Sequence, residues 1–123
     1  MTSVLNVDEI AAKDGTSPVE LTKQSAAKAW VHIDGTGTVT IDGSFNVASV
    51  TDSGTGTYAP SFTNSMSDSS YSPTMLTEIP SNAADNAYRV FSMATGSYSL
   101  QYYQGGTQAD VDPCTSNVCG DLA

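Results

Sequence analysis

Basic residues are scarce in this sequence. Only 4 lysine and arginine residues stand against 13 acidic ones, which gives a formal net charge of −9 at pH 7. Proteins that bind nucleic acid or anionic membranes neutralise phosphates with clustered lysine and arginine. The composition therefore argues against both kinds of partner. The sequence also lacks an apolar run long enough to cross a bilayer, so membrane insertion is not expected.

Groups that carry catalysis are equally few. His32 is the only histidine, and no serine lies within a Gly-x-Ser-x-Gly motif. Many aspartates lie in turn sequences, where aspartate is common because it accepts hydrogen bonds from nearby backbone N–H groups: Asp34, Asp42, Asp52, Asp68 and Asp85. A carboxylate pair for glycoside hydrolysis is the alternative interpretation. We expect a protein that is not an enzyme and that needs no cofactor.

Cysteine occurs twice, as Cys114 and Cys119, with four residues between them. A local disulfide would staple a segment rich in turn residues, and two free thiols are the alternative. Together with His32, the cysteines supply at most three of the four ligands that a structural zinc site needs. No metal is therefore expected, although three aspartates in the same part of the chain offer a weak Ca²⁺ site as an alternative: Asp110, Asp112 and Asp121.

Serine, threonine, glycine and asparagine take the place of the missing charges. They make up 48 of the 123 residues, as 17 serines, 15 threonines, 10 glycines and 6 asparagines. These residues suit strands and turns rather than helices. Ten aromatic residues, together with many valines and threonines, argue against disorder for most of the chain.

Short β-rich segments alternate with turn sequences such as 34–37 and 52–56. Seven or eight such segments predict an all-β fold, a small antiparallel β-sandwich of the jelly-roll-like or immunoglobulin-like kind. Pro60 predicts an edge position or a bulge for its strand. The predicted strands are 30–33, 38–41, 45–50, 58–62, 71–79, 88–93 and 98–103, and Ala109, Val111 and Val118 would close a final hairpin.

The first 28 residues differ from the rest in charge. They carry four acidic residues and three lysines, a balance of −1, whereas residues 29–123 carry nine acidic residues and one arginine, a balance of −8. We therefore predict an N-terminal docking arm (1–28) followed by a β-sandwich domain (29–123). The arm packs on its own domain or anchors the chain to a partner. Its apolar residues are the candidates for that contact: Val4, Leu5, Val7, Ile10, Val19 and Leu21.

Three of the tyrosines are candidates for a binding surface on which sugar rings would stack: Tyr98, Tyr102 and Tyr103. The alternative is packing in the core or between subunits, with the hydroxyl groups reaching the rim. Tyr102 and Tyr103 are neighbours in a predicted strand and therefore point to opposite faces of a sheet.

Several segments resemble a domain of one class of proteins. Four runs are similar to a β-rich domain of tail-fibre and other virion appendage proteins of tailed bacteriophages: Lys28-Ala29-Trp30-Val31-His32-Ile33-Asp34-Gly35-Thr36-Gly37-Thr38-Val39, Ser44-Phe45-Asn46-Val47 through Thr57-Tyr58, Phe62-Thr63-Asn64, and Met66-x-Asp68-x-x-Tyr71. The stretch from Leu5 to Trp30 resembles the segment that often precedes such domains. These segments lie between Leu5 and Tyr71, a span of more than half of the chain, and leave out Cys114 and Cys119.

The resemblance implies a non-enzymatic virion protein, a homotrimeric short fibre or tail-fibre module. Its arm would contact other virion proteins, and its β domain would contact a host-surface glycan. The first residues have neither the basic nor the apolar region of a signal peptide, which fits assembly in the host cytoplasm before display on the particle exterior. On such a particle, a Cys114–Cys119 disulfide would form after release from the reducing cytoplasm.

Two other kinds of protein remain as alternatives. One is a capsid decoration protein that stabilises the head shell. The other, less favoured, is a carbohydrate-binding module or a glycan depolymerase. The short length and the lack of a repeat-built shaft argue against a long receptor fibre.

Overall fold

The computed structural model describes residues 26–78 and 85–123, and every structural statement below refers to these. They form nine strands and no helix, so none of them forms a helix that could span a membrane. The strands are β1 (Ala27–Asp34), β2 (Thr40–Phe45), β3 (Val47–Asp52), β4 (Thr57–Phe62), β5 (Ser72–Thr77), β6 (Ala87–Ala94), β7 (Ser97–Gln104), β8 (Thr107–Gln108) and β9 (Cys114–Cys119).

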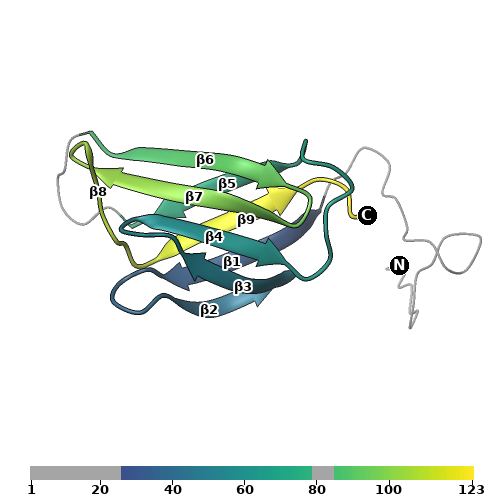
Figure 1. Cartoon of the computed structure of the whole chain (residues 1–123), viewed down its shortest axis with the longest axis horizontal. Coiled ribbons are helices and arrows are strands. Elements are labelled where there is room, and N and C mark those ends of the chain that lie inside the picture. Colours follow the sequence, from purple (N-terminus) through teal and green to yellow (C-terminus); the bar gives the residue numbers. More distant parts are fainter. Residues whose placement is uncertain (1–25, 79–84) are drawn as a thin grey trace, which may run out of the picture.

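The strands build two sheets that pack face to face (Figure 1). Sheet A has the order β2-β1-β9-β5, and sheet B has the order β3-β4-β7-β6, with the short β8 paired to β7. Every strand pair is antiparallel. The predicted all-β antiparallel sandwich is confirmed. β1 begins at Ala27, two residues before the boundary expected after Lys28.

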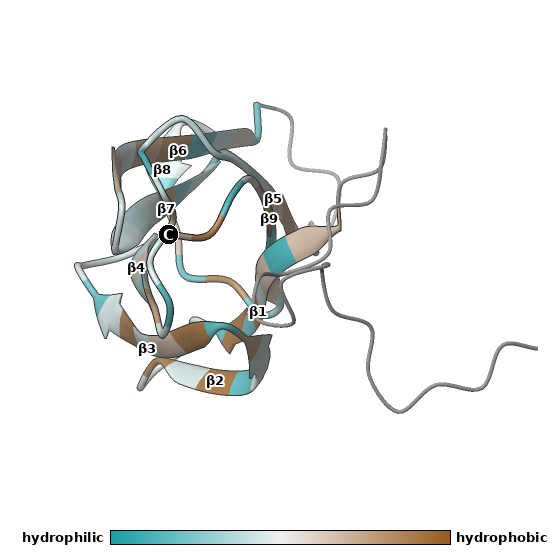
Figure 2. Ribbon diagram, turned by 90° about the vertical axis from the view of Figure 1, so that its right-hand side faces the viewer, coloured by the Kyte–Doolittle hydropathy of each residue, from teal (hydrophilic) through white to brown (hydrophobic). Residues whose placement is uncertain are grey.

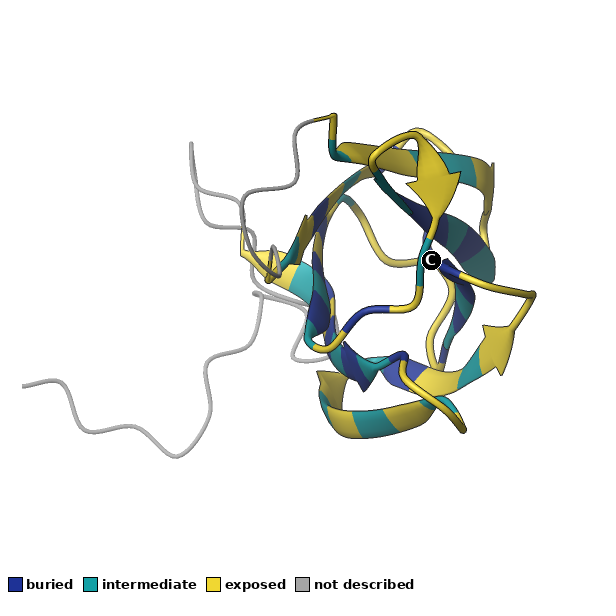
Figure 3. Cartoon of the chain, turned by 90° about the vertical axis from the view of Figure 1, so that its left-hand side faces the viewer, coloured by how far each residue is buried: buried dark blue, intermediate teal, exposed yellow. Residues whose placement is uncertain are grey.

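The core lies between the sheets because inward and outward side chains alternate along each strand. On β1, Ala29, Val31 and Ile33 are buried, whereas Trp30 between them is exposed. Tyr98, Leu100 and Tyr102 face them from β7 and have no exposed surface. Seen end on, the ribbon encloses an interior between two layers, with apolar and buried segments of the strands around it (Figures 2 and 3).

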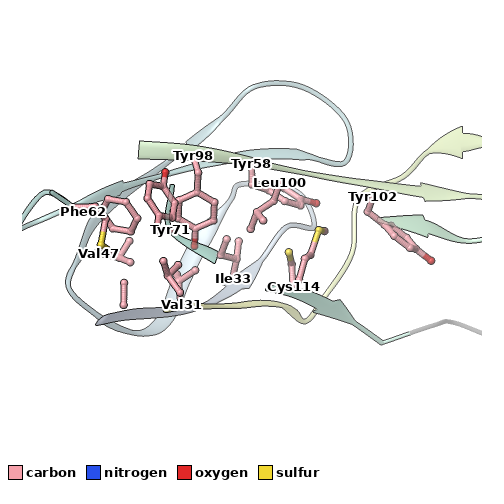
Figure 4. Close-up of a cluster of buried hydrophobic side chains, with 14 of the residues drawn as sticks. Val31, Ile33, Val47, Tyr58, Phe62, Tyr71, Tyr98, Leu100, Tyr102 and Cys114 are labelled. Carbon is pink, nitrogen blue, oxygen red and sulfur yellow. The ribbon is translucent and has the colours of Figure 1, made fainter. Parts of the chain in front are cut away.

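Aromatic rings fill one end of the core (Figure 4). Phe62 stacks on Tyr98 with ring centroids 5.4 Å apart, and Tyr71 meets both rings edge on. The Tyr98 hydroxyl donates a hydrogen bond of 3.0 Å to Ser116 Oγ on the opposite sheet. The Tyr71 hydroxyl lies 2.9 and 2.8 Å from the carbonyl oxygens of Ala94 and Ser97. The polar ends of these core tyrosines are therefore satisfied within the sandwich.

The chain crosses from sheet A to sheet B at Asn46, between β2 and β3. Asn46 has a positive φ of 55°, a conformation that asparagine tolerates better than most residues. Its Nδ2 group donates to the carbonyl oxygens of Lys28 and Asn64, and its Oδ1 accepts from the N–H of Asn64 at 2.7 Å. One side chain thus ties the crossing to the start of β1 and to the loop after β4.

Two local predictions are wrong. β4 is not an edge strand, since it lies between β3 and β7. It pairs with β7 at Tyr58 and Ser61 without a register shift, and the two strands do not pair at Ala59 or Pro60, where proline has no N–H to donate. Its pairing with β3 does contain a bulge, but the extra residue is Ala48 of β3, opposite Phe62 and Ser61, and not Pro60. The final hairpin consists only of β7 and β8.

Val118 belongs instead to β9, which lies inside sheet A between β1 and β5. The segment after Gly106 therefore contributes a central strand, and the tail hairpin expected around Val118 does not form.

Candidate functional site

The outer face of sheet A carries an exposed aromatic pair. Trp30 of β1 and Phe45 of β2 are direct cross-strand partners, and 41% and 54% of their surfaces are exposed. Gly43 makes room for the indole, because a side chain at this position would lie 3.3 Å from Cη2 and Cζ3 of Trp30. The indole therefore lies across β2, and the pair forms a flat apolar surface.

The same face continues across β9 and β5. Trp30 pairs with Asn117, which pairs with Thr74, while His32 pairs with Thr115, which pairs with Leu76. Leu76 is 68% exposed. Two apolar ends, Trp30–Phe45 on one side and Leu76 on the other, thus flank a strip of small polar side chains.

A group of three ionisable side chains lies on this face, at the end of the sheet where β1 ends and where β2 and β9 begin (left in Figure 1). His32 Nε2 and Asp42 Oδ2 are 3.9 Å apart, and Asp112 joins them from the segment before β9. A β-bulge brings Asp42 there: His32 pairs with Gly43 and Ile33 with Ile41, so Asp42 is the extra residue of β2.

The backbone next to Asp112 is fixed by a buried tyrosine. The N–H of Val111 donates to the Tyr58 hydroxyl at 3.2 Å, and the N–H of Gly35 donates to the Val111 carbonyl at 3.0 Å. The Tyr58 hydroxyl in turn lies 3.4 Å from the Gly35 carbonyl. Burial raises the pKa of Tyr58 to about 12, so the hydroxyl remains protonated at neutral pH.

Other aspartates bind backbone groups of loops, as their turn sequences predict. Asp34 accepts hydrogen bonds from the hydroxyl and the N–H of Thr36, which lower the pKa of its carboxyl. Asp52 and Asp68 each accept from the N–H two residues later. Asp110, which the sequence offered only as a Ca²⁺ ligand, accepts from the N–H of Gly56 in the turn between β3 and β4 at 2.7 Å. Asp42 departs from the prediction, since it lies within a strand and faces His32.

Two of the three tyrosines predicted as a binding surface are core residues. Tyr98 and Tyr102 have no exposed surface, because alternation along β7 turns them inward with Leu100. Their hydroxyls donate to Ser116 Oγ and Asn86 Oδ1. Tyr103 points to the other face, as predicted, is half-buried, and donates to Gln101 Oε1. The three rings therefore do not form one surface.

The cysteines do not form the disulfide that was one of the two alternatives. Both are free, and they lie at opposite ends of β9, with Cys114 buried and Cys119 exposed. A strand of this length separates its ends far beyond the span of about 4.4–6.8 Å that a disulfide allows between Cα atoms. The same strand keeps Asp121 away from Asp110 and Asp112, so the three-aspartate Ca²⁺ group is not assembled.

The predicted arm contacts lie outside the described residues. These are Val4, Leu5, Val7, Ile10, Val19 and Leu21.

Trp30, Phe45 and Leu76 were not predicted as surface residues, nor Asp42 and Asp112 as partners of His32. The alternation Ala29-Trp30-Val31-His32-Ile33 was the one signal for Trp30, because three small or aliphatic residues suited to a core flank two larger side chains. The bulge that orients Asp42 has no signal of its own in the sequence.

In comparisons with known proteins, no family model and no curated protein matches the sequence, and no solved structure matches the fold. The functional argument therefore depends on the residues themselves, above all on the outer face of sheet A.

Proposed function

We propose that this chain is a structural, non-enzymatic protein of a bacteriophage virion. It is a short, trimeric fibre or tail-fibre module, anchored to the particle by its N-terminal arm and displaying the sandwich to the host surface. The support for this role is the likeness of residues 5–71 to virion appendage domains, together with the exposed outer face of sheet A.

The observation that carries the proposal is the exposed Trp30–Phe45 pair. These rings lie on the outer face of sheet A rather than in the core, and contiguous exposed apolar patches mark sites of interaction. A partner that covered both would remove on the order of 200 Å² of aromatic surface from water, worth about 5 kcal/mol before the costs of association. Contact with a partner is the role that this face suits best.

The position of the pair also fits display. Trp30 lies on β1, the strand that follows the arm directly, and the pair is on the outside of the sandwich. Aromatic faces bind sugar rings by stacking, with polar neighbours supplying hydrogen bonds, and several copies on one particle would multiply a weak affinity for a host glycan.

The first test is the place and copy number of the chain in purified particles that contain it. Quantitative densitometry should find tens of copies per particle for a fibre module, and hundreds would favour the capsid decoration alternative. Deletion of residues 1–25 should abolish incorporation. A truncated chain that still enters particles would contradict the role of the arm.

The second test concerns the outer face. A Trp30→Ser, Phe45→Ser double variant should leave the fold intact, and isolated full-length protein carrying it should no longer compete with particles for adsorption to host cells. Asn117→Ser, on the same face, is the matched control and should compete like the parent. If the double variant competes equally well, the aromatic pair is not the host contact. Sedimentation of the parent tests the trimer directly.

A further inference from the structure

We propose that His32, Asp42 and Asp112 bind one divalent transition-metal ion on the outer face of sheet A. This site is independent of the virion role proposed above, since it depends only on side chains that the fold brings together. The residues come from three separate places, namely β1, β2 and the segment before β9.

The distances are close to those of a metal site. The three ligand atoms lie within 4.8 Å of one another, and the His32–Asp42 pair is at 3.9 Å. Ligands bound at about 2.0–2.2 Å from a Zn²⁺ ion lie roughly 3–4 Å apart. Small side-chain rotations, with no movement of the strands, are enough to close the remaining difference.

The donor set favours a transition metal over Ca²⁺. Imidazole nitrogen suits Zn²⁺, Cu²⁺, Fe²⁺ and Ni²⁺, whereas Ca²⁺ takes six to eight oxygen ligands. One imidazole and two carboxylates form a three-ligand site with positions left for water. The partial exposure of His32 and Asp42 leaves room for those waters on the solvent side.

The backbone holds the positions of Asp42 and Asp112 beside His32 without a metal. The bulge fixes Asp42 beside His32. Asp112 follows Val111, which is hydrogen-bonded to Tyr58 and Gly35, and precedes the buried Cys114 by two residues. A preorganised set of ligands loses less conformational entropy when an ion binds.

Local charge also favours a cation at this point. Asp34 already accepts hydrogen bonds from Thr36 in its own turn, and Asp110 accepts one from the N–H of Gly56 in the turn between β3 and β4. Asp42 and Asp112 instead face the imidazole. Among the described residues the cationic side chains are Lys28, four residues before His32 on β1, and Arg89 on sheet B, where it covers the Phe91 ring at 4.6 Å. Neither belongs to the cluster, so two carboxylates concentrate negative charge there.

The test uses the full-length chain with Cys119→Ser, so that the exposed thiol does not compete for the ion. Titration calorimetry with Zn²⁺ should show one saturable site per chain. His32→Ala, Asp42→Asn and Asp112→Asn should each weaken binding at least tenfold. Asp52→Asn is the matched control, because it removes an equal charge from an exposed turn of sheet B, and it should bind Zn²⁺ like the parent. Circular dichroism confirms that each variant is folded.

Mn²⁺ gives an independent readout by nuclear magnetic resonance. The bound ion should broaden the amide signals of Gly43 and Thr115, the strand partners of His32, before those of sheet B. The proposal is overturned if the parent shows no saturable Zn²⁺ site at millimolar ion, or if the three variants bind as tightly as the parent. Tighter binding of Ca²⁺ than of Zn²⁺ would overturn the assignment to a transition metal.

Discussion

The hydroxyl of Tyr58 joins segments that are far apart in the sequence. It accepts from the N–H of Val111 and lies against the carbonyl of Gly35, so it links the turn after β1 to the segment before β9. Glycine is required at position 35 because a Cβ there would collide with the Tyr58 hydroxyl. The hydrogen bond from Val111 to Tyr58 fixes the segment that carries Asp112. The buried Tyr58 is therefore important for the surface group of His32, Asp42 and Asp112.

Gly35→Ala should therefore destabilise the fold by about 1–3 kcal/mol, the usual cost of overpacking a full core. Chemical denaturation monitored by the fluorescence of Trp30 would measure the loss. Gly96→Ala is the control, since a Cβ there meets nothing closer than Ser65 Oγ at 3.9 Å, and it should change stability by less than about 0.5 kcal/mol. A Cβ at position 35 would also collide with Cζ and Cε1 of the Tyr58 ring, so Gly35→Ala should remain costly in a Tyr58→Phe background. If Gly35→Ala costs no more than Gly96→Ala, the close packing of Gly35 against Tyr58 is incorrect.

The two thiols should differ sharply in reactivity. Cys119 is exposed, whereas Cys114 has no exposed surface and burial raises the pKa of its thiol to about 12. A thiol reagent such as Ellman's reagent should find one rapidly reacting group per native chain and two per chain in denaturant, without any reductant. Finding no reactive thiol in denaturant would mean that the cysteines are bonded after all.

At the scale of elements, β9 is the strand on which sheet A depends. It pairs with β1 on one side and with β5 on the other, and it buries Cys114, Ser116 and Val118 on its inner face. Asn117 lies on the outer face of the same strand and is exposed. Neighbouring positions of one strand should therefore differ in their contribution to stability.

Val118→Ala should lower the free energy of unfolding by about 1–3 kcal/mol, because it removes buried methyl groups and leaves a cavity. Asn117→Ala should change it by no more than about 0.5 kcal/mol. Urea denaturation of the two variants beside the parent is the measurement. If both variants lose the same stability, the inward and outward assignment of β9 is incorrect.

The strands that the sequence predicts well are those with local signals. Segment 98–103 alternates large apolar residues with polar ones, and segment 30–33 is rich in β-branched and aromatic residues before a clear turn. Both are strands within one to three residues of the predicted ends. β9 reads Cys-Thr-Ser-Asn-Val-Cys, which has little apolar content. Its conformation is set by strands that pair with it from both sides, and a local pattern contains no information about such partners.

The candidate site is predicted less well because it too depends on which strands pair, and a local sequence pattern does not show that. A tyrosine-rich strand suggests surface aromatics, but whether Tyr98 faces inward depends on which side of sheet B the other sheet covers. The choice of Asp42 rather than Asp34 as the partner of His32 depends on one bulge between β1 and β2. The orientation of Tyr98 and the position of Asp42 both follow from how strands pair and pack, which the local sequence does not show.

At the scale of the whole molecule, two buried tyrosine hydroxyls and one buried thiol make the free energy of unfolding depend on pH in the alkaline range. Burial raises the pKa of Tyr58, Tyr98 and Cys114 to about 12, above their ordinary values of 10.0, 10.0 and 9.0. At pH values between the ordinary pKa of each group and its raised pKa, the unfolded chain has lost protons that the folded chain still binds. Unfolding therefore becomes more favourable as pH rises. The three protonated groups contribute fully to the free energy of unfolding below about pH 9, and this contribution is lost progressively toward pH 12.

The free energy of unfolding should accordingly fall between pH 9 and pH 12, as measured by urea denaturation at a series of pH values. Tyr98→Phe should be less stable at pH 8, since Ser116 loses its partner, yet its stability should fall less steeply with pH than that of the parent. A pH dependence identical to that of the parent would show that Tyr98 does not titrate as its burial implies.

The pairing of β1 with β9 also determines when the domain can form during translation. Asp34 and Cys114 are separated by 80 residues, which a ribosome adds in about 4 to 16 s at about 5–20 residues per second. Until then β1 has β2 on one side and an open edge on the other, with its apolar face uncovered. A message cut short before codon 114 would therefore yield a chain whose β1 and β5 both lack their partner, an aggregation-prone product rather than a smaller working domain.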